Sequence, residues 1–277
     1  MKPLCLVLCH VGDRSAVRVY CALRERLRPG VVELVSGEEL VLAPQWRHVM
    51  DSGHVGTELT LADGRRLCTD SMGLVFQRIQ QFEMPQFARA NADDREYAVT
   101  EMHALLLSWL EGLPGPVVNP AGPRGLCGAD RSRLEWMKLA ATAGLPPRRF
   151  ELVSDSRRFN CPDLVPHLAV VSMGSSDPPS IPRPELLGRA PAQYIELLDG
   201  PQRRVLVAGR RCFGLPVGAS AEACVTLADL SGDHLLEVRL GTVRGEWRFC
   251  SATPMPEIPP EAAGFVADSL AGMRMAA

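Results

Sequence analysis

The sequence contains almost no lysine. Lys2 and Lys138 are its two lysines, so arginine carries nearly all of the 30 positive charges that stand against 32 acidic residues. The formal net charge of −2 is nearly neutral, and no block of basic residues stands out. Such a chain has no strong field that would attract nucleic acid. We therefore expect no nucleic-acid partner and little chemistry that depends on an ammonium group.

Long apolar runs are missing as well. A transmembrane helix needs a run of about 20 apolar residues, and no segment of the chain approaches that length. The apolar start of the chain is short, and Asp13 and Arg14 follow it directly. This pattern indicates a buried strand rather than a signal peptide. We expect a cytoplasmic protein with no membrane partner.

Paired cysteines are absent too. The nine cysteines are scattered, and no two of them form a Cys-x-x-Cys motif. In a reducing compartment such cysteines behave mostly as small buried hydrophobic residues. The spacing gives no support to a zinc site or a disulfide framework.

The start of the chain has the pattern of an α/β domain. Residues 4–9 are an apolar run typical of a buried parallel strand. Asp13 lies in a turn that caps a helix, in which Val17, Tyr20, Leu23 and Leu27 recur at helical spacing. Residues 31–35 form the next predicted strand. This β-α-β order favours an α/β fold with a parallel sheet.

The rest of the chain alternates between strands and a few helices. Turn residues, helix caps and apolar periodicity predict the elements that follow. The predicted helices cover residues 93–112, 130–143 and 260–275, and in the second of them Leu134, Met137, Leu139 and Ala141 are expected to face inward. The predicted strands cover residues 57–61, 66–68, 74–76, 117–118, 150–153, 167–171, 193–197, 204–208, 211–214, 235–240 and 246–250.

These elements divide the chain into three expected parts. Residues 1–118 form an N-terminal α/β domain with a parallel sheet. Residues 119–191 form a small central subdomain, in which residues 154–191 are rich in proline, serine and arginine. Residues 192–277 form a C-terminal subdomain built on an antiparallel sheet.

Several short motifs occur in an order that resembles the ATP-grasp superfamily. They are Val117-Val118-Asn119-Pro120, Ala143-Gly144-Leu145-Pro146-Pro147, Arg204-Val205-Leu206-Val207-Ala208-Gly209 and the Pro254-Met255-Pro256 exit. The branch that the chain resembles most is that of the RimK-like and graspetide (microviridin-type) peptide ligases. The resemblance extends over most of the chain and depends on the order of the motifs rather than on any one of them.

This resemblance implies a particular chemistry. Such ligases use ATP and magnesium to activate a carboxylate as an acyl phosphate, which an amine, hydroxyl or thiol then attacks. The chemistry needs cations against the phosphates and magnesium bridging them to carboxylates. A peptide or protein substrate is therefore expected, together with either a homo-oligomer or a ligase partner.

The nucleotide-binding positions of the family map onto six residues of this chain, three for the phosphates and three for adenine. Arg133 replaces the first family lysine, and its fork of donors can still bind phosphate; alternatively it is a solvated residue at the start of a helix. Ser172 replaces the second lysine and carries no charge. Arg204 matches the family arginine that faces the phosphates and is the expected catalytic residue. Gln193, Ile195 and Glu196 match the segment that reads adenine, although an ordinary strand is an equal interpretation.

The metal-binding positions match least well. The first family carboxylate aligns near Glu237 or Arg239, depending on the length of the hairpin. Ser251 and Thr253 occupy the positions of the family glutamate and asparagine. Magnesium prefers an oxygen shell with one or two carboxylates, which hydroxyls replace poorly. If the strand ends align differently, the ligands come from elsewhere, and the candidates are Asp229, Asp233 and Glu257.

Three hypotheses follow. The first is a degenerate ATP-grasp protein that serves as a binding or partner subunit. The second is a working carboxylate–amine ligase with a rearranged site, in which Arg133, Arg204 and Glu237 handle the nucleotide. The third places a ligand or partner site in the N-terminal domain near His10 and Asp13, because ligands of α/β folds bind at strand ends.

Overall fold

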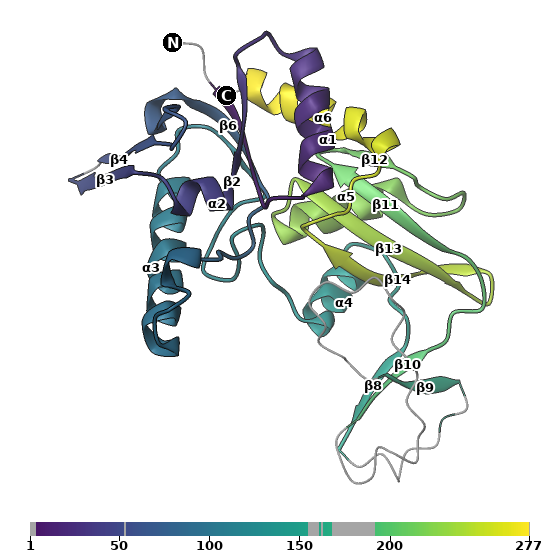
Figure 1. The fold of residues 1–277 in the computed structure, drawn as a ribbon. Helices are drawn as coiled ribbons and strands as arrows, with labels where there is room; N and C mark the ends of the chain where they lie inside the picture. Colours follow the sequence, from purple (N-terminus) through teal and green to yellow (C-terminus); the bar gives the residue numbers. More distant parts are fainter. Residues whose placement is uncertain (1–3, 53, 155–160, 162, 168–191, 277) are drawn as a thin grey trace.

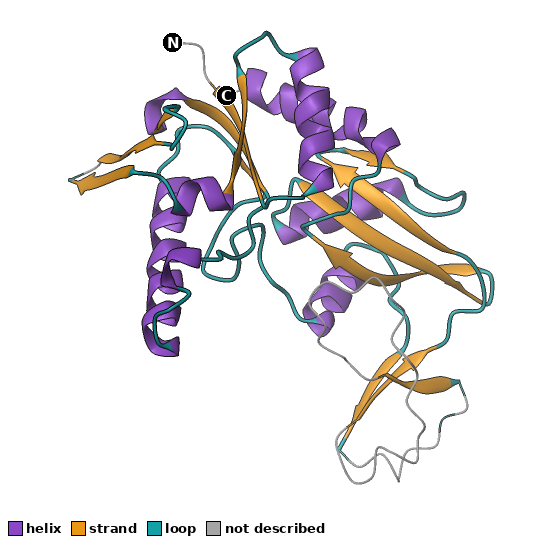
Figure 2. Ribbon diagram, in the orientation of Figure 1, coloured by secondary structure: helices purple, strands orange, loops and turns teal. Residues whose placement is uncertain are grey.

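The structure is a computed structural model that describes residues 4–276, apart from residues 53, 155–160, 162 and 168–191. Three bodies of secondary structure follow one another along the chain (Figure 1). A mixed N-terminal part is followed by a small three-stranded sheet and then by a larger antiparallel sheet with helices on both of its faces (Figure 2). The expected α/β fold is confirmed.

The N-terminal part contains a four-stranded parallel sheet. Its strands, in spatial order, are β2 (Val32–Ser36), β1 (Leu4–Cys9), β6 (Met72–Gln77) and β7 (Val117–Val118). Helix α1 (Arg14–Arg26) joins β1 to β2, and the Asp13 carboxylate caps it by accepting from the Ala16 N–H at 2.9 Å. The predicted β-α-β opening is therefore present.

A second sheet lies beside the parallel sheet. It contains β3 (Gln45–Asp51), β4 (His54–Thr60) and β5 (Arg66–Cys68), all antiparallel. The predicted β4–β5 hairpin turns at Gly64, whose φ of 85° suits glycine. Helices α2 (Gly37–Val41) and α3 (Ala92–Glu111) belong to this part, with two short 3₁₀ turns at Thr69–Ser71 and Pro85–Phe87. The sequence analysis did not predict β3 or α2.

The central part starts with helix α4 (Arg133–Thr142), which is capped by Ser132. A small antiparallel sheet follows, with the spatial order β8 (Phe150–Val153), β10 (Ala192–Glu196) and β9 (Leu164–His167). Because β10 is the middle strand, the expected boundary at residues 191/192 falls inside this sheet. The predicted strand at 167–171 overlaps β9 only at His167, and its other residues lie outside the described residues.

The C-terminal sheet is antiparallel. Its strands, in spatial order, are β12 (Arg211–Phe213), β11 (Gln202–Ala208), β13 (Leu235–Val243) and β14 (Glu246–Thr253). Helices α4 and α5 (Ala221–Ser231) pack on one of its faces through a shared core with Val205, Val238 and Phe249. The last helix, α6 (Pro260–Ala276), packs at the end of the other face.

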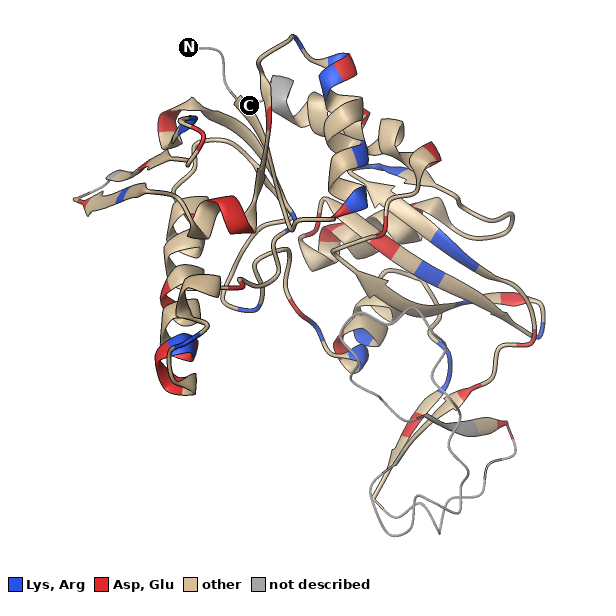
Figure 3. Cartoon of the chain, in the orientation of Figure 1, with Lys and Arg blue, Asp and Glu red and all other residues tan. Residues whose placement is uncertain are grey.

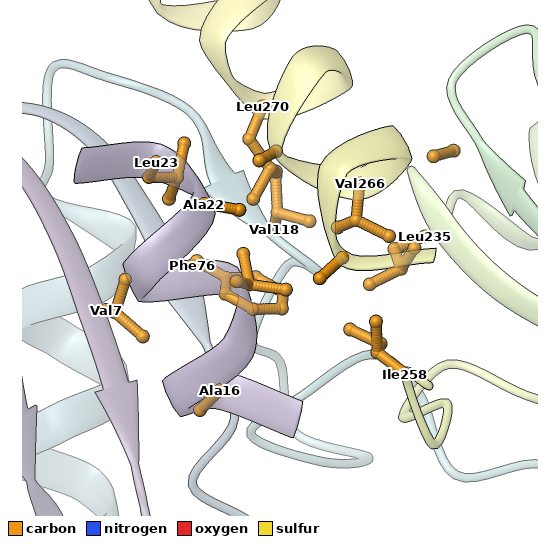
Figure 4. Close-up of a cluster of buried hydrophobic side chains, with 14 of the residues drawn as sticks. Val7, Ala16, Ala22, Leu23, Phe76, Val118, Leu235, Ile258, Val266 and Leu270 are labelled. Atoms are coloured by element: carbon orange, nitrogen blue, oxygen red, sulfur yellow. The ribbon is translucent and has the colours of Figure 1, made fainter. Parts of the chain in front are cut away.

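One hydrophobic core joins the two ends of the chain. Helices α1 and α6 lie side by side (Figure 1). Phe76 and Val118 from the N-terminal sheet pack in the same cluster as Leu235 of β13 and Val266 and Leu270 of α6 (Figure 4). The C-terminal sheet is therefore fixed against the N-terminal domain, and this holds the ends of β13 and β14 in place.

The predicted inner faces of two helices need correction. In α1, Leu23 is buried and Tyr20 and Leu27 pack against the core as predicted. Val17, however, is 43% exposed, and Ala16 and Val19 are fully buried. In α4, Leu134 is 48% exposed, whereas Trp136 is buried. The buried face of α1 is rich in alanine because small side chains allow α6 to approach closely.

Candidate functional site

The polar residues of interest share one face of the C-terminal sheet. On β13 and β14, Glu237 lies opposite Thr253 and Arg239 lies opposite Ser251. Arg204 of β11 lies opposite Arg239. Because directly opposed residues of an antiparallel pair project to the same side, all five side chains lie on one face. We call these five residues the site face. Figure 3 shows acidic and basic positions close together on these strands.

Glu237 is the buried acid of the site face. It is 1% exposed, and its Oε1 accepts a hydrogen bond from Arg239 Nε at 2.7 Å. Its Oε2 is buried and has no partner among the described residues. The Arg239 side chain is half exposed. The carboxylate on β13 is thus held by an arginine of the same strand.

Arg204 forms an ion pair at the rim of the site face. Its Nη1 donates to Glu257 Oε2 at 2.7 Å, and both side chains are exposed. The hydrogen bond that Arg204 donates to Glu257 raises the pKa of Arg204, to which the charge of Glu237 also contributes. The same bond lowers the pKa of Glu257, with smaller effects from Arg18 and Arg239. These residues therefore form one connected group of charges.

The exit from β14 is anchored to the N-terminal domain. Buried Asn119 donates from Nδ2 to the carbonyls of Leu235 and Pro254, each at 2.6 Å. Arg78 donates to the Pro256 carbonyl at 3.1 Å and holds Asp13 at 2.7 Å. These bonds fix the Pro254-Met255-Pro256 segment through its backbone. Thr253 Oγ1 adds one bond by accepting from the Met255 N–H at 3.2 Å. The strand end is therefore held mainly through backbone carbonyls, together with the Thr253 hydroxyl.

Two further arginines lie near the site face. Arg133, at the start of α4, has its pKa lowered by burial and then by the like charge of Arg148. Arg148 donates from Nη1 to the Glu196 carbonyl at 3.1 Å. Burial raises the pKa of the Cys250 thiol, and Arg148 and Arg239 partly offset this effect. The Arg148 N–H donates to the Phe249 carbonyl at 3.2 Å, so Arg148 lies beside β14. The sequence analysis missed this arginine, since only the preceding Pro146-Pro147 marks its position.

The segment expected to read adenine is the middle strand of the central sheet. Gln193 and Ile195 of β10 have neighbours on both sides, in β8 and β9. The Glu196 N–H donates to the Arg149 carbonyl at 2.9 Å, and its carbonyl accepts from Arg148. The backbone groups on both sides of this strand are therefore already paired within the protein. Adenine contacts at this segment stay a prediction, and Ser172 lies outside the described residues.

The other candidate acids do not gather at the site face. Asp233 is buried and pairs with Arg131 at 3.4 Å, and Asp229 is exposed at the end of α5. Glu257 pairs with Arg204. Across the described part of the chain, no group of three or more His, Cys, Asp or Glu side chains is arranged to hold a metal ion.

The N-terminal alternative consists of residues with structural partners. The Asp13 carboxylate caps α1 and pairs with buried Arg78. His10 Nε2 accepts from the Gln80 N–H at 3.1 Å. A cavity of about 690 Å³ lies elsewhere, along α3, where Met84, Tyr97 and Met102 line it. None of its lining residues belongs to the site face.

Magnesium does not fit the residues of the site face. Such an ion prefers an octahedral oxygen shell with one or two carboxylates. Here the side chain opposite Ser251 is an arginine, and one oxygen of the single acid, Glu237, is already bound to that arginine. The phosphates of ATP fit better, because arginine forks bind phosphate oxygens in bidentate fashion.

Searches by sequence found no relatives. No protein-family profile matches the chain, and no curated protein matches it. Among the helices that the structure describes, none is both long and apolar enough to cross a membrane.

Solved structures do resemble the chain. A RiPP-associated ATP-grasp ligase of Chryseobacterium gregarium, in complex with ADP and a leader and core peptide, has a TM-score of 0.74 at 14% identity, covering 98% of this chain and 97% of that one. The macrocyclase MdnB of Microcystis aeruginosa has a TM-score of 0.73 at 16% identity, covering 97% and 99%. The ATP-grasp ligase PsnB, complexed with minimal precursor, Mg and ADP, has a TM-score of 0.71 at 19% identity, covering 98% of each chain.

The likeness extends over nearly the whole of each chain, at identities too low to carry residue roles across. It agrees with the resemblance in the order of motifs and with the three-part arrangement of sheets. The chain therefore has the ATP-grasp fold, in the form seen in peptide-modifying ligases.

Proposed function

We propose that this protein is a non-catalytic member of the ATP-grasp fold that binds a peptide or a ligase partner instead of forming the bond itself. One observation carries the proposal. Arg239 and Ser251 face each other on β13 and β14, and the resemblance to the family puts metal-binding acids at Ser251 and at either Glu237 or Arg239. A positive side chain there opposes a cation, and a hydroxyl cannot replace the missing charge.

The preserved scaffold supports a retained binding role. Asn119 and Arg78 hold the exit of β14 through backbone carbonyls, so the loss of metal ligands leaves the strand end intact. Structural relatives were solved with precursor peptides. A peptide is accordingly the proposed ligand, and a fold alone does not fix the reaction.

The test is ADP release from ATP and magnesium, measured with and without the precursor peptides of the structural relatives. We expect no ADP above the protein-free blank, in either case, for wild type and for Arg204→Ala. Peptide-stimulated release that disappears in Arg204→Ala but persists in Arg203→Ala would refute the proposal. Arg203 is the matched control because it neighbours Arg204 and projects from the opposite face of β11.

A working ligase with a rearranged site is the second candidate. The observation that favours it is Glu237, whose Oε2 is buried without a partner among the described residues. In that case Glu237 would bind the cation after releasing Arg239, and Arg133 and Arg204 would bind the phosphates. Glu237→Gln would then abolish the magnesium-dependent release of ADP.

A further inference from the structure

Four arginines from different parts of the chain lie on β11 and β13 or beside the neighbouring strand β14. They are Arg133 of α4, Arg148 before β8, Arg204 of β11 and Arg239 of β13, and we call them the arginine cluster. Arg204 and Arg239 are cross-strand neighbours. The Arg148 N–H donates to the Phe249 carbonyl of β14 at 3.2 Å, and α4, which Arg133 starts, packs against the same strand.

The acids beside the arginine cluster do not balance its charge. Glu237 pairs with Arg239, and Glu257 pairs with Arg204. The two arginines nearest the central sheet, Arg133 and Arg148, have no carboxylate partner among the described residues. Like charges at short range repel one another, so the arrangement favours a bound anion.

Buried arginine N–H groups without a hydrogen-bond partner also favour a bound anion. Arg133 Nη1 and Arg148 Nε are buried and have no hydrogen-bond partner among the described residues. A buried donor without a partner costs about 1–3 kcal/mol, so native structures rarely leave one without a reason. Arg239 uses Nε for Glu237 and Arg204 uses Nη1 for Glu257. An arginine has five N–H donors, so both retain others.

We infer that the arginine cluster binds the triphosphate of ATP without a divalent cation, with the guanidinium of Arg239 supplying the positive charge that magnesium supplies in a working ligase. This inference rests on the proposed function, since it assumes the same scaffold and the same loss of metal ligands. It adds that the nucleotide is a ligand in its metal-free form.

Magnesium should therefore weaken binding instead of strengthening it. Free ATP carries about two more negative charges than its magnesium complex, and attraction to a cluster of cations grows with ligand charge. A working ligase shows the opposite dependence, because its ion bridges the phosphates to carboxylates. The sign of the magnesium effect thus separates the two kinds of site.

The experiment is isothermal titration of the full chain with ATP, once in EDTA and once in excess magnesium. We expect binding in EDTA, at least about threefold weaker binding in magnesium, and weaker binding at high salt. Tripolyphosphate should compete with ATP, and adenosine should not, because the cluster recognises phosphate.

Two charge-removing variants locate the site. Arg239→Gln keeps an N–H donor for Glu237 and should weaken ATP binding in EDTA by about tenfold, the effect of losing about 1.4 kcal/mol. Arg203→Gln removes the same charge from the opposite face of β11 and should leave the affinity unchanged. Circular dichroism confirms that each variant is folded. Equal affinities for the two variants would overturn the inference.

The remaining outcomes separate this inference from the proposed function. Absence of ATP binding in both buffers would overturn the inference alone, since a peptide-binding subunit needs no nucleotide. ATP binding that requires magnesium would overturn both.

Discussion

Arg239 on β13 lies directly opposite Ser251 on β14, and its Nε donates to the Glu237 carboxylate at 2.7 Å. In this arrangement the acid of the site face, Glu237, is bound by a guanidinium of the same strand. Glu237 is 1% exposed, so its charge depends on this partner. The chemistry of the site face follows from this triad of side chains.

Removing Arg239 should destabilise the fold. Arg239→Ala leaves both oxygens of buried Glu237 without a partner, at an expected cost of about 1–3 kcal/mol in the free energy of unfolding. Urea titration measures this cost. Arg248→Ala is the control, because Arg248 pairs with an exposed acid, Glu246, and such pairs contribute at most about 1 kcal/mol. Equal costs for the two variants would show that Glu237 does not need Arg239.

Two glycines with the same backbone angle provide a matched test of how the β14 exit is packed. Gly128 and Gly232 both have φ of 75°. A Cβ on Gly128 would lie 2.5 Å from Pro254 Cβ, whereas one on Gly232 would meet no atom within 4 Å. Gly232→Ala should cost about 1–2 kcal/mol for the left-handed backbone alone. Gly128→Ala should cost clearly more in thermal or urea unfolding, and a smaller cost would contradict the contact with Pro254.

Stability should decrease as the pH falls below the ordinary histidine pKa of about 6.5. Burial lowers the pKa of His234 and of His103 in the folded protein. The unfolded chain therefore binds protons first on acidification, and each such histidine contributes a slope of up to about 1.4 kcal/mol per pH unit. His234 lies where β13 meets α6, with Nε2 3.0 Å from Ser269 Oγ.

The test compares wild type with His234→Gln by urea unfolding at several pH values between about 5 and 7, the window set by the histidine pKa. The variant should lose less stability than wild type over this range. An unchanged pH slope would mean that His234 does not carry the effect.

Carboxylates introduced on the site face should create a magnesium site. The triple variant Arg239→Asp, Ser251→Glu and Thr253→Asn places two new carboxylates and an amide beside Glu237 on the site face. Titration with ATP should then show affinity that rises with magnesium, reversing the wild-type dependence. The neutral set Arg239→Asn, Ser251→Gln and Thr253→Asn has nearly the same shape. If both sets respond to magnesium alike, carboxylates are not what the wild-type site lacks.

Much of the fold could be predicted from local patterns. The apolar run at 4–9, the Asp13 cap and the turn at Gly245 predicted the parallel opening and the β13–β14 hairpin, because these signals are local in sequence. Helix α5 was missed although Ser220 caps its start and left-handed Gly232 ends it. The inner face of α1 was predicted correctly at Leu23 and wrongly at Val17, because the alanines that complete this face bury little area and carry a weak hydropathy signal.

The site was harder to predict because its geometry comes from long-range pairing. The alignment of motifs left open whether Glu237 or Arg239 stands at the position of the family's first metal-binding carboxylate. The strand register alone shows that Arg239 faces Ser251. Arg148 reaches the site from a loop, and no periodic pattern marks such a residue. The positions of Ser172 and its neighbours lie outside the described residues, so that assignment stays a prediction.

The most direct test of the central claim is a crystal structure of the protein with ATP and manganese, whose anomalous scattering locates the ion. The account predicts a triphosphate bound by Arg239 and Arg204, with no anomalous peak between β13 and β14. A manganese ion coordinated by Glu237 and bridged to the phosphates would contradict it.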